Sequence, residues 1–504
     1  MTLQDPRSKN WLQYLPLLVN LSLTIGLGAS LNIWHDEAFS LHTTDGSPLR
    51  AITQAINFEL QPPLYFLLLN LWRQLNSSPF FARLFSILCI ALTLALMTRV
   101  ARRLFPSIHP FWPSAFLAAN QFLIWAAVEI RCYALVLCLS AILFSFFLDA
   151  YLEDPPRKSS QWYYMLFSLL SLYTQYYLGF LLVAHFLALL AIKRWSASRA
   201  YLLDMLWVVL GAIPLFLLVP QHVASHTGPV VPLQAALGDI RLAWWRVSYY
   251  ILPDIPELLP PTLRAARSYL VLLLLIFLLV FGIIRFRRLL NPIPVAVVTI
   301  LVFLTATYLL LCKFVGPDLT EVRHTAFLFL PASFAFLTVV VTLLGRKGII
   351  ASTTIILAFN LFMLQMRYSP PAKQGDWKHV AKYLMASENS NQPVLIFRSQ
   401  QALPLSYHYS GKNTLVPIPR ELNFEKWDLK DLSLNDEEEV LEAIRRVPGQ
   451  HSEFWLVTDG VVQYLGVRFH PELLEKVIAD FFTVESVKRF PDTQVRLLRL
   501  RRAF

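Results

Sequence analysis

Residues 133–152 read Tyr-Ala-Leu-Val-Leu-Cys-Leu-Ser-Ala-Ile-Leu-Phe-Ser-Phe-Phe-Leu-Asp-Ala-Tyr-Leu, with Asp149 as the single charged side chain. A hydrocarbon layer about 30 Å thick needs about 20 apolar residues in a crossing helix, so this stretch predicts a membrane span. Similar stretches recur along the chain, and together they predict an α-helical polytopic membrane protein with about eleven transmembrane helices. The others lie near 12–31, 82–99, 111–128, 161–178, 179–192, 201–219, 268–284, 293–312, 325–344 and 348–366.

The composition supports this class and excludes others. Of the 504 residues, 56% are hydrophobic and 15% are charged, whereas soluble domains carry about 25% charged residues. The net charge of +11 is also typical of proteins that bind nucleic acid or anionic lipid. Here, however, the basic residues gather in alternate short loops, so we expect membrane lipids and no nucleic acid as partners. These clusters are Arg7/Lys9, Arg99/Arg102/Arg103, Arg157/Lys158, Lys193/Arg194/Arg199, Arg285/Arg287/Arg288 and Arg346/Lys347.

The same clusters predict the orientation of the chain. Loops rich in Lys and Arg face the cytoplasm, so we expect a cytoplasmic N-terminus and a C-terminal domain on the periplasmic or extracellular side. The boundary between spans 161–178 and 179–192 rests on a weak break at Tyr176, Tyr177 and Gly179. A merged span there would invert the topology beyond it.

The composition changes after residue 366. Of the 33 acidic residues, 18 fall in residues 367–504. Short apolar runs at 394–397 and 454–457 predict buried strands, and the stretches 378–386, 437–446 and 471–481 predict helices. We therefore expect a transmembrane domain over 1–366, with a first outer loop at 32–81 and a long outer loop at 220–267, followed by a small non-cytoplasmic α/β domain over 367–504.

The first outer loop contains the most unusual charges. It reads Trp34-His35-Asp36-Glu37-Ala38 and later Glu59-Leu60-Gln61-Pro62-Pro63. Charge beside hydrocarbon is costly and is usually kept for function, although solvation at the membrane surface is the simpler explanation. The two prolines fix the backbone and so give a rigid entry to the short apolar segment that follows.

Two other outer loops place arginines at the same membrane face. The second loop reads Glu129-Ile-Arg131-Cys-Tyr133, and the third contains Arg323 just before the span at 325–344. Glu129 and Arg131 either pair with each other, or Glu129 orients the Arg131 fork toward a phosphate group. Two arginines at one face suit a lipid phosphate.

The order of these motifs resembles a known family. Asp36-Glu37, Pro62-Pro-Leu-Tyr65, Glu129-x-Arg-x-Tyr133, Tyr173-Thr-Gln-Tyr-Tyr177, Arg323 and Gly375-Asp-Trp-Lys378 follow one another as they do in bacterial membrane glycosyltransferases of the GT-C class. The similarity is greatest to the superfamily of protein O-mannosyltransferases and aminoarabinose transferases. It covers roughly residues 11–385, most firmly 32–190.

This resemblance implies a GT-C fold in the bacterial inner membrane and a sugar donor on polyprenyl phosphate. The acceptor would be a hydroxyl or phosphate on a glycolipid, a polysaccharide or a protein. Asp36 matches the family's catalytic acid and Glu37 its neighbour, while Arg131, with Arg323, is expected to bind the donor phosphate. Further contacts to donor or acceptor are expected from Glu59, Gln61, Glu129, Tyr133 and Tyr176.

Two departures from the family pattern bear on a metal. Gln61 stands where His or Lys is common before the prolines, and Gln175 stands where His is frequent. No cofactor is therefore predicted with certainty, and a divalent metal is left open. His222 and His226 have the spacing of metal ligands on a helix, but Gly228 and the prolines nearby predict a loop.

These groups predict a mechanism and leave two rivals. Asp36 would deprotonate an acceptor hydroxyl while Arg131 and Arg323 stabilise the leaving phosphate, and direct displacement would invert the anomeric centre. The main rival is a multi-pass lipid or solute transporter or flippase. Transporters usually carry ionisable groups near the bilayer midplane, whereas here the acids gather at one face. The third reading is a structural membrane subunit whose outer domain binds a partner.

Overall fold

The chain divides into two compact units in the computed structural model, which describes residues 10–220, 222, 250–251, 324–368, 372–464 and 467–501. The helical unit comprises residues 1–28, 61–72 and 80–366, and the sheet unit comprises residues 29–60, 73–79 and 367–504. Two predicted spans, 268–284 and 293–312, lie outside the described residues, as do Arg323, His226 and nearly all of the loop 220–267.

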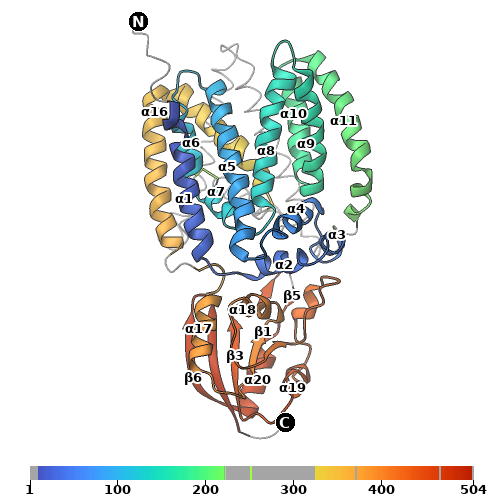
Figure 1. Ribbon diagram of the computed structural model, residues 1–504, viewed down its shortest axis with the longest axis vertical. Coiled ribbons are helices and arrows are strands. Elements are labelled where there is room, and N and C mark those ends of the chain that lie inside the picture. The colour runs from blue at the N-terminus through green and yellow to red at the C-terminus, as the bar shows by residue number, and fades with distance from the viewer. Residues whose placement is uncertain are drawn as a thin grey trace, which may run out of the picture. The chain divides into compact units, whose positions relative to one another are not determined.

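Long apolar helices dominate the helical unit (Figure 1). Among the described residues, five segments are long and apolar enough to cross a membrane: Trp11–Ser30, Pro79–Leu104, Tyr133–Leu152, Trp195–Phe216 and Ala326–Arg367. The chain is thus a multi-pass integral membrane protein, as the sequence predicts. The helices are α1 (Leu15–Ser30), α4 (Leu64–Arg73), α5 (Pro79–Leu104), α6 (Phe111–Ala118), α7 (Gln121–Ala127), α8 (Tyr133–Phe147, continued by a π-helical turn to Leu152), α9 (Lys158–Thr174), α10 (Leu178–Ala191), α11 (Trp195–Phe216) and α16 (Phe329–Arg367).

Two predicted breaks between spans are confirmed. Helix α9 ends at Thr174 and α10 begins at Leu178, so 161–178 and 179–192 form separate helices. In α16, Gly345 has φ 61° and ψ −153°, a conformation that favours glycine because it has no Cβ. This kink separates the two spans predicted at 325–344 and 348–366.

The stretch 111–128 differs from the single helix that the sequence predicts. Asn120 interrupts it: its side chain accepts a hydrogen bond from the Phe122 N–H at 2.9 Å and donates one to the Tyr250 carbonyl at 2.8 Å. Asparagine is among the preferred residues at a helix N-cap. The amide therefore ends α6 and starts α7 inside an otherwise apolar stretch.

A five-stranded mixed sheet forms the centre of the sheet unit. The strand order is β2-β1-β3-β7-β6, with β2, β1 and β3 parallel and β3, β7 and β6 antiparallel. A short hairpin of β4 (Gln463–Tyr464) and β5 (Val467–Arg468) lies apart from this sheet. The strands are β1 (Val394–Phe397), β2 (Leu415–Ile418), β3 (Glu453–Asp459), β6 (Phe482–Phe490) and β7 (Thr493–Leu500).

Helices cover both faces of this sheet, because alternate strand residues point to opposite sides. On one face, Val394 and Ile396 pack with α17 (Trp377–Ser387) and α18 (Ala402–Ser406). On the other, Leu395 and Phe397 pack with α19 (Glu438–Arg445) and α20 (Pro471–Phe481). The α/β domain is therefore confirmed, including its two predicted strands and three predicted helices. The sheet unit also contains α2 (His35–Thr43) and α3 (Pro48–Asn57) of the first outer loop.

Trp377 is the largest fully buried side chain of α17, with 1% of its surface exposed. We expect Trp377→Ala to lower the free energy of unfolding of the sheet unit by about 3–5 kcal/mol, because it removes buried aromatic surface and leaves a cavity. Pulse proteolysis across a urea series on detergent-purified protein measures this change. Met385→Ala on the same helix, where the side chain is 37% exposed, is the control and should unfold nearly as the unmodified protein does. Equal stability of the two variants would contradict the proposed packing.

Candidate functional site

The predicted site residues fall into both units. Asp36, Glu37 and Glu59 belong to the sheet unit, and Arg323 lies outside the described residues. The helical unit contains Gln61, Glu129, Arg131, Tyr133 and Tyr176.

Asp36 and Glu37 lie in the first turn of α2. Negative side chains are favourable there, since the helix dipole places partial positive charge at this end. Both carboxylates are buried: 9% of Asp36 and none of Glu37 is exposed. A carboxylate enclosed to this degree requires a charged or hydrogen-bonding partner.

The two adjacent carboxylates have different surroundings. The Nζ of Lys373 lies 2.9 Å from Oε1 of Glu37, and the side chains of this ion pair are 6% and 0% exposed. For Asp36, the Nε2 of His35 lies 3.4 Å from Oδ1, and 12% of the Asp36 side chain is exposed. Glu37 is thus enclosed and neutralised, while Asp36 keeps access to solvent.

A fully buried asparagine precedes this helix and binds the start of the C-terminal region. The Lys373 N–H donates to Oδ1 of Asn32 at 2.7 Å, and Nδ2 of Asn32 donates to the carbonyls of Lys373 at 3.0 Å and Gly375 at 2.8 Å. Gly375 has φ 99°, and a Cβ there would lie 2.8 Å from Nε1 of Trp377, so glycine is required in this turn. The Asn32 amide thus donates to the carbonyl and accepts from the N–H of the same residue, Lys373. These two bonds fix the backbone from which the Lys373 side chain extends.

The C-terminal end of α2 is anchored as well. Nη1 of Arg73 donates to the Leu41 carbonyl at 2.6 Å and to Oγ1 of Thr44 at 2.8 Å, and a cation is favourable at this end of a helix. The Thr43 hydroxyl donates to Oε1 of Glu59 at 3.2 Å. The structure therefore brings Glu59 to the same helix as Asp36 and Glu37.

Aromatic side chains hold the remaining face of α2 within the sheet unit. Phe39 packs edge-on against Phe58 and Trp427, with ring centroids 5.3 and 5.4 Å apart. His42 stacks on Phe424 at 3.8 Å. The sequence alone could not have matched α2 to these partners, because Phe424 and Trp427 lie in an irregular stretch without periodicity.

In the helical unit, the link between α7 and α8 contains two buried charged residues. Glu129 is 1% exposed and Arg131 is 7% exposed. The Ser86 hydroxyl of α5 donates to the Glu129 carbonyl at 2.7 Å, and the Cys132 thiol donates to Oε1 of Gln61 at 3.7 Å. The structure therefore brings Gln61 to this link.

Aromatic rings flank the predicted residues of the helical unit. Tyr133 stacks on Trp125 with centroids 4.9 Å apart. Tyr176 lies at the break between α9 and α10, where its hydroxyl contacts Nδ1 of His222 at 3.0 Å. His222 thus has a hydrogen-bonding partner at Nδ1, while His226 lies outside the described residues.

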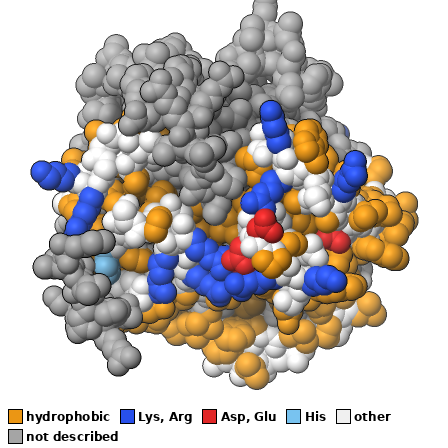
Figure 2. Space-filling model, turned by 90° about the horizontal axis from the view of Figure 1, so that it is seen from above, with side chains coloured by type: hydrophobic (Ala, Val, Ile, Leu, Met, Phe, Trp, Pro, Cys, Tyr) orange, Lys and Arg blue, Asp and Glu red, His pale blue; other side chains and the backbone are white. Residues whose placement is uncertain are grey.

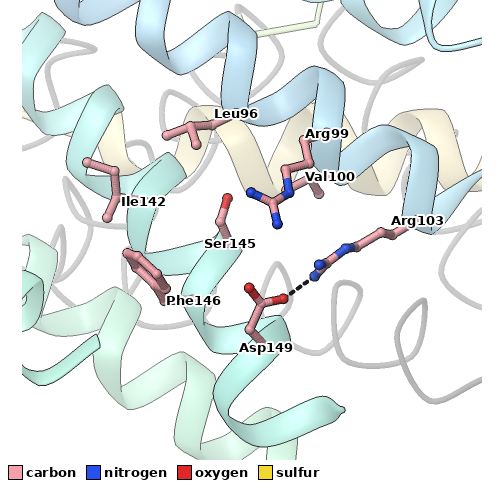
Figure 3. Close-up of a pocket in the computed structure, with 8 residues that line it drawn as sticks. All are labelled: Leu96, Arg99, Val100, Arg103, Ile142, Ser145, Phe146 and Asp149. Carbon is pink, nitrogen blue, oxygen red and sulfur yellow. Dashed lines mark hydrogen bonds and ion pairs between the residues drawn. The ribbon is translucent and has the colours of Figure 1, made fainter. Parts of the chain in front are cut away.

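A separate cluster of ion pairs lies at the C-terminal end of α5. Arg103 forms an ion pair with Asp149 and lies 3.6 Å from Glu153, which pairs with Arg157 at 2.8 Å. Figure 2 shows basic side chains gathered around acidic ones on this end of the helical unit. Arg99 and Arg103 point toward Ser145 and Asp149 around a cavity of about 70 Å³ (Figure 3). From Ser86 to Arg99 the helix rises by about 20 Å, so this cavity is distinct from the Glu129–Arg131 link.

The described residues do not group three or more His, Cys, Asp or Glu side chains in an arrangement that fits a metal ion. The first turn of α2 brings together the Asp36 and Glu37 carboxylates, the Lys373 ammonium and the His35 ring.

Comparison with known proteins adds distant structural similarity. No family model and no curated protein matches the chain. The chain is similar to the crystal structure of ArnT from Cupriavidus metallidurans bound to undecaprenyl phosphate, with 13% identity, a TM-score of 0.40, and coverage of 96% of this chain and 97% of that one. The apo state of ArnT gives 13% identity, a TM-score of 0.42, and coverage of 95% and 97%. Similarities this distant assign neither fold family nor function, so we infer both from the residues of this chain.

His42 provides a pH-dependent test of the packing on α2. Burial, with a smaller effect of Arg50, lowers the His42 pKa below its ordinary value, so folding favours the neutral ring. The associated stability is complete above pH 6.5 and is lost as the pH falls below that value. When the pH is lowered from 7.5 to 5.5, we expect the thermal midpoint of the sheet unit to drop less in His42→Phe than in the unmodified protein. Scanning fluorimetry measures both midpoints. Identical pH slopes would show that His42 does not contribute.

Proposed function

We propose that this chain is an integral-membrane glycosyltransferase of the GT-C class, within the superfamily of protein O-mannosyltransferases and aminoarabinose transferases. It would move a sugar from a polyprenyl-phosphate donor to a hydroxyl or phosphate of a glycolipid, polysaccharide or protein, at the outer face of a bacterial inner membrane. One observation carries the proposal: two adjacent carboxylates are buried in the first turn of α2, directly after a membrane-span candidate. The Glu37 side chain is fully enclosed beside Lys373, whereas 12% of the Asp36 side chain is exposed. Such costly placement at a membrane boundary indicates function.

Asp36 is proposed as the general base. An acceptor hydroxyl loses its proton to the Asp36 carboxylate as its oxygen attacks the anomeric carbon. The bond between that carbon and the phosphate oxygen breaks, and the electron pair leaves with the polyprenyl phosphate. A single displacement of this kind inverts the anomeric centre.

Arg131 is proposed to bind the donor phosphate, together with Arg323. A guanidinium remains protonated and presents two parallel N–H groups that match two phosphate oxygens. The burial of Arg131 at 7% exposure strengthens such charge-assisted bonds, because less water competes for them. Gln61, Glu129, Tyr133, Tyr176 and Glu59 are proposed to contact donor or acceptor.

We expect Asp36→Asn to lower kcat by about 10²- to 10⁴-fold, because the amide cannot accept the acceptor proton. The assay uses purified protein, a panel of radiolabelled undecaprenyl-phosphate sugars and an envelope fraction as acceptor. Asp45→Asn, an exposed acid of the same loop, is the matched control and should retain activity. Intact turnover in Asp36→Asn would refute the assigned base. Movement of unchanged donor between the leaflets of vesicles, with none consumed, would favour the flippase instead.

We expect Arg131→Ala to weaken binding of undecaprenyl phosphate by about 10- to 100-fold, the equivalent of losing one charge-assisted interaction. Arg131→Lys should recover only part of this, since an ammonium lacks the bidentate fork. Binding of undecaprenol, which has no phosphate, should not change in either variant. Arg102→Ala, an exposed arginine of α5, serves as the control. Equal losses for undecaprenyl phosphate and undecaprenol would point to a structural role for Arg131.

A further inference from the structure

We propose that Lys373, at the start of the C-terminal region, is a positioning residue for the first turn of α2: it neutralises Glu37 and thereby sets the direction of Asp36. The proposal deepens the function proposed above and rests on it for the role of Asp36. It makes the C-terminal region a required part of the catalytic apparatus.

The geometry assigns the Lys373 side chain to an ion pair with Glu37. Its Nζ lies 2.9 Å from Oε1 of Glu37, and the Lys373 side chain is 6% exposed. An ammonium held against a fully enclosed carboxylate is committed to that ion pair. In the proposal, Lys373 acts on the reaction through this contact with Glu37.

Lys373 is prepared for this contact by its backbone. A lysine side chain loses considerable rotational freedom when it is immobilised. Its backbone also loses freedom when it is fixed. The two hydrogen bonds between Asn32 and the Lys373 backbone, at 2.7 and 3.0 Å, already fix that backbone, so only the side chain has to be ordered for the ion pair. Asn32 lies just before α2 in the chain. The same amide therefore links the residues that precede the helix to the backbone of Lys373.

Glu37 transmits the constraint to Asp36. The two residues are consecutive in one helical turn, and their side chains leave the helix about 100° apart. When Glu37 is fixed inside, the direction of Asp36 follows from helix geometry. Loss of the cation would leave the buried Glu37 charge without its ammonium partner, which is strongly unfavourable, and the first turn would move or unwind to solvate it.

The deciding measurements are kinetic. In the donor assay, Lys373→Met should lower kcat by about 10- to 100-fold while the KM for the undecaprenyl-phosphate sugar changes little, because Lys373 does not touch the donor. Lys373→Arg keeps a cation at this position and should restore most of kcat. Lys382→Met, an exposed lysine of α17, is the control. Unchanged kcat in Lys373→Met would overturn the proposal.

The double variant Glu37→Gln/Lys373→Met separates positioning from stability. It removes both charges, so its thermal midpoint should return toward that of the unmodified protein, whereas its kcat should stay low. Recovery of both quantities together would overturn the positioning role and leave the pair as a structural contact.

Hydrogen–deuterium exchange tests the hold on α2 without any substrate. Amides of residues 35–43 should exchange faster in Lys373→Met than in Lys382→Met, while those of 48–57 in α3 serve as the internal reference. If the unmodified protein turns over no donor, the proposed function fails, and this measurement alone decides whether Lys373 holds the helix. Equal exchange in both variants would overturn that hold.

Discussion

The buried amide of Asn32 joins segments that are 341 residues apart in the sequence, and the geometry of the sheet unit around α2 depends on it. Its Oδ1 and Nδ2 satisfy one backbone donor and two backbone carbonyls of residues 373–375. A buried backbone group left without a partner costs about 1–3 kcal/mol. Separating the two segments would therefore cost the free energy of these buried hydrogen bonds. The same contacts position the backbone of Lys373, whose side chain neutralises Glu37.

The membrane explains why such an attachment is needed. Helices that cross hydrocarbon have to be apolar and satisfy their own backbone hydrogen bonds, so reactive polar groups concentrate at helix ends and in links. Asp36, Glu59, Arg131 and Tyr176 all lie in such places. A short link has little core of its own, and its precision has to come from neighbouring structure. In the first outer loop, residues of the C-terminal region supply that structure through hydrogen bonds, an ion pair and aromatic packing.

Sequence predicted the features that depend on local chemistry. The helix breaks near Tyr176 and Gly345 and the bounds of α20 at Pro471 and Phe481 follow from turn and capping preferences. The interruption at Asn120 was not predicted, because one polar residue in an apolar run reads equally well as part of a span. Neither the Glu37–Lys373 pair nor the aromatic contacts of Trp427 were predicted either, since contacts between distant segments leave no periodic pattern in a single sequence.

The difference between Asp36 and Glu37 shows what the structure adds to a two-residue motif. In the sequence, a resemblance to a family separates the two carboxylates, but their own surroundings do not. In the fold, one is fully enclosed against an ammonium group, and the other retains an exposed edge beside His35. If both were exposed and charged, their mutual repulsion would favour protonation of one of them. The Lys373 ammonium offsets the Glu37 charge and so weakens that repulsion. This arrangement fits the base role proposed for Asp36, with Glu37 fixing the orientation of the turn.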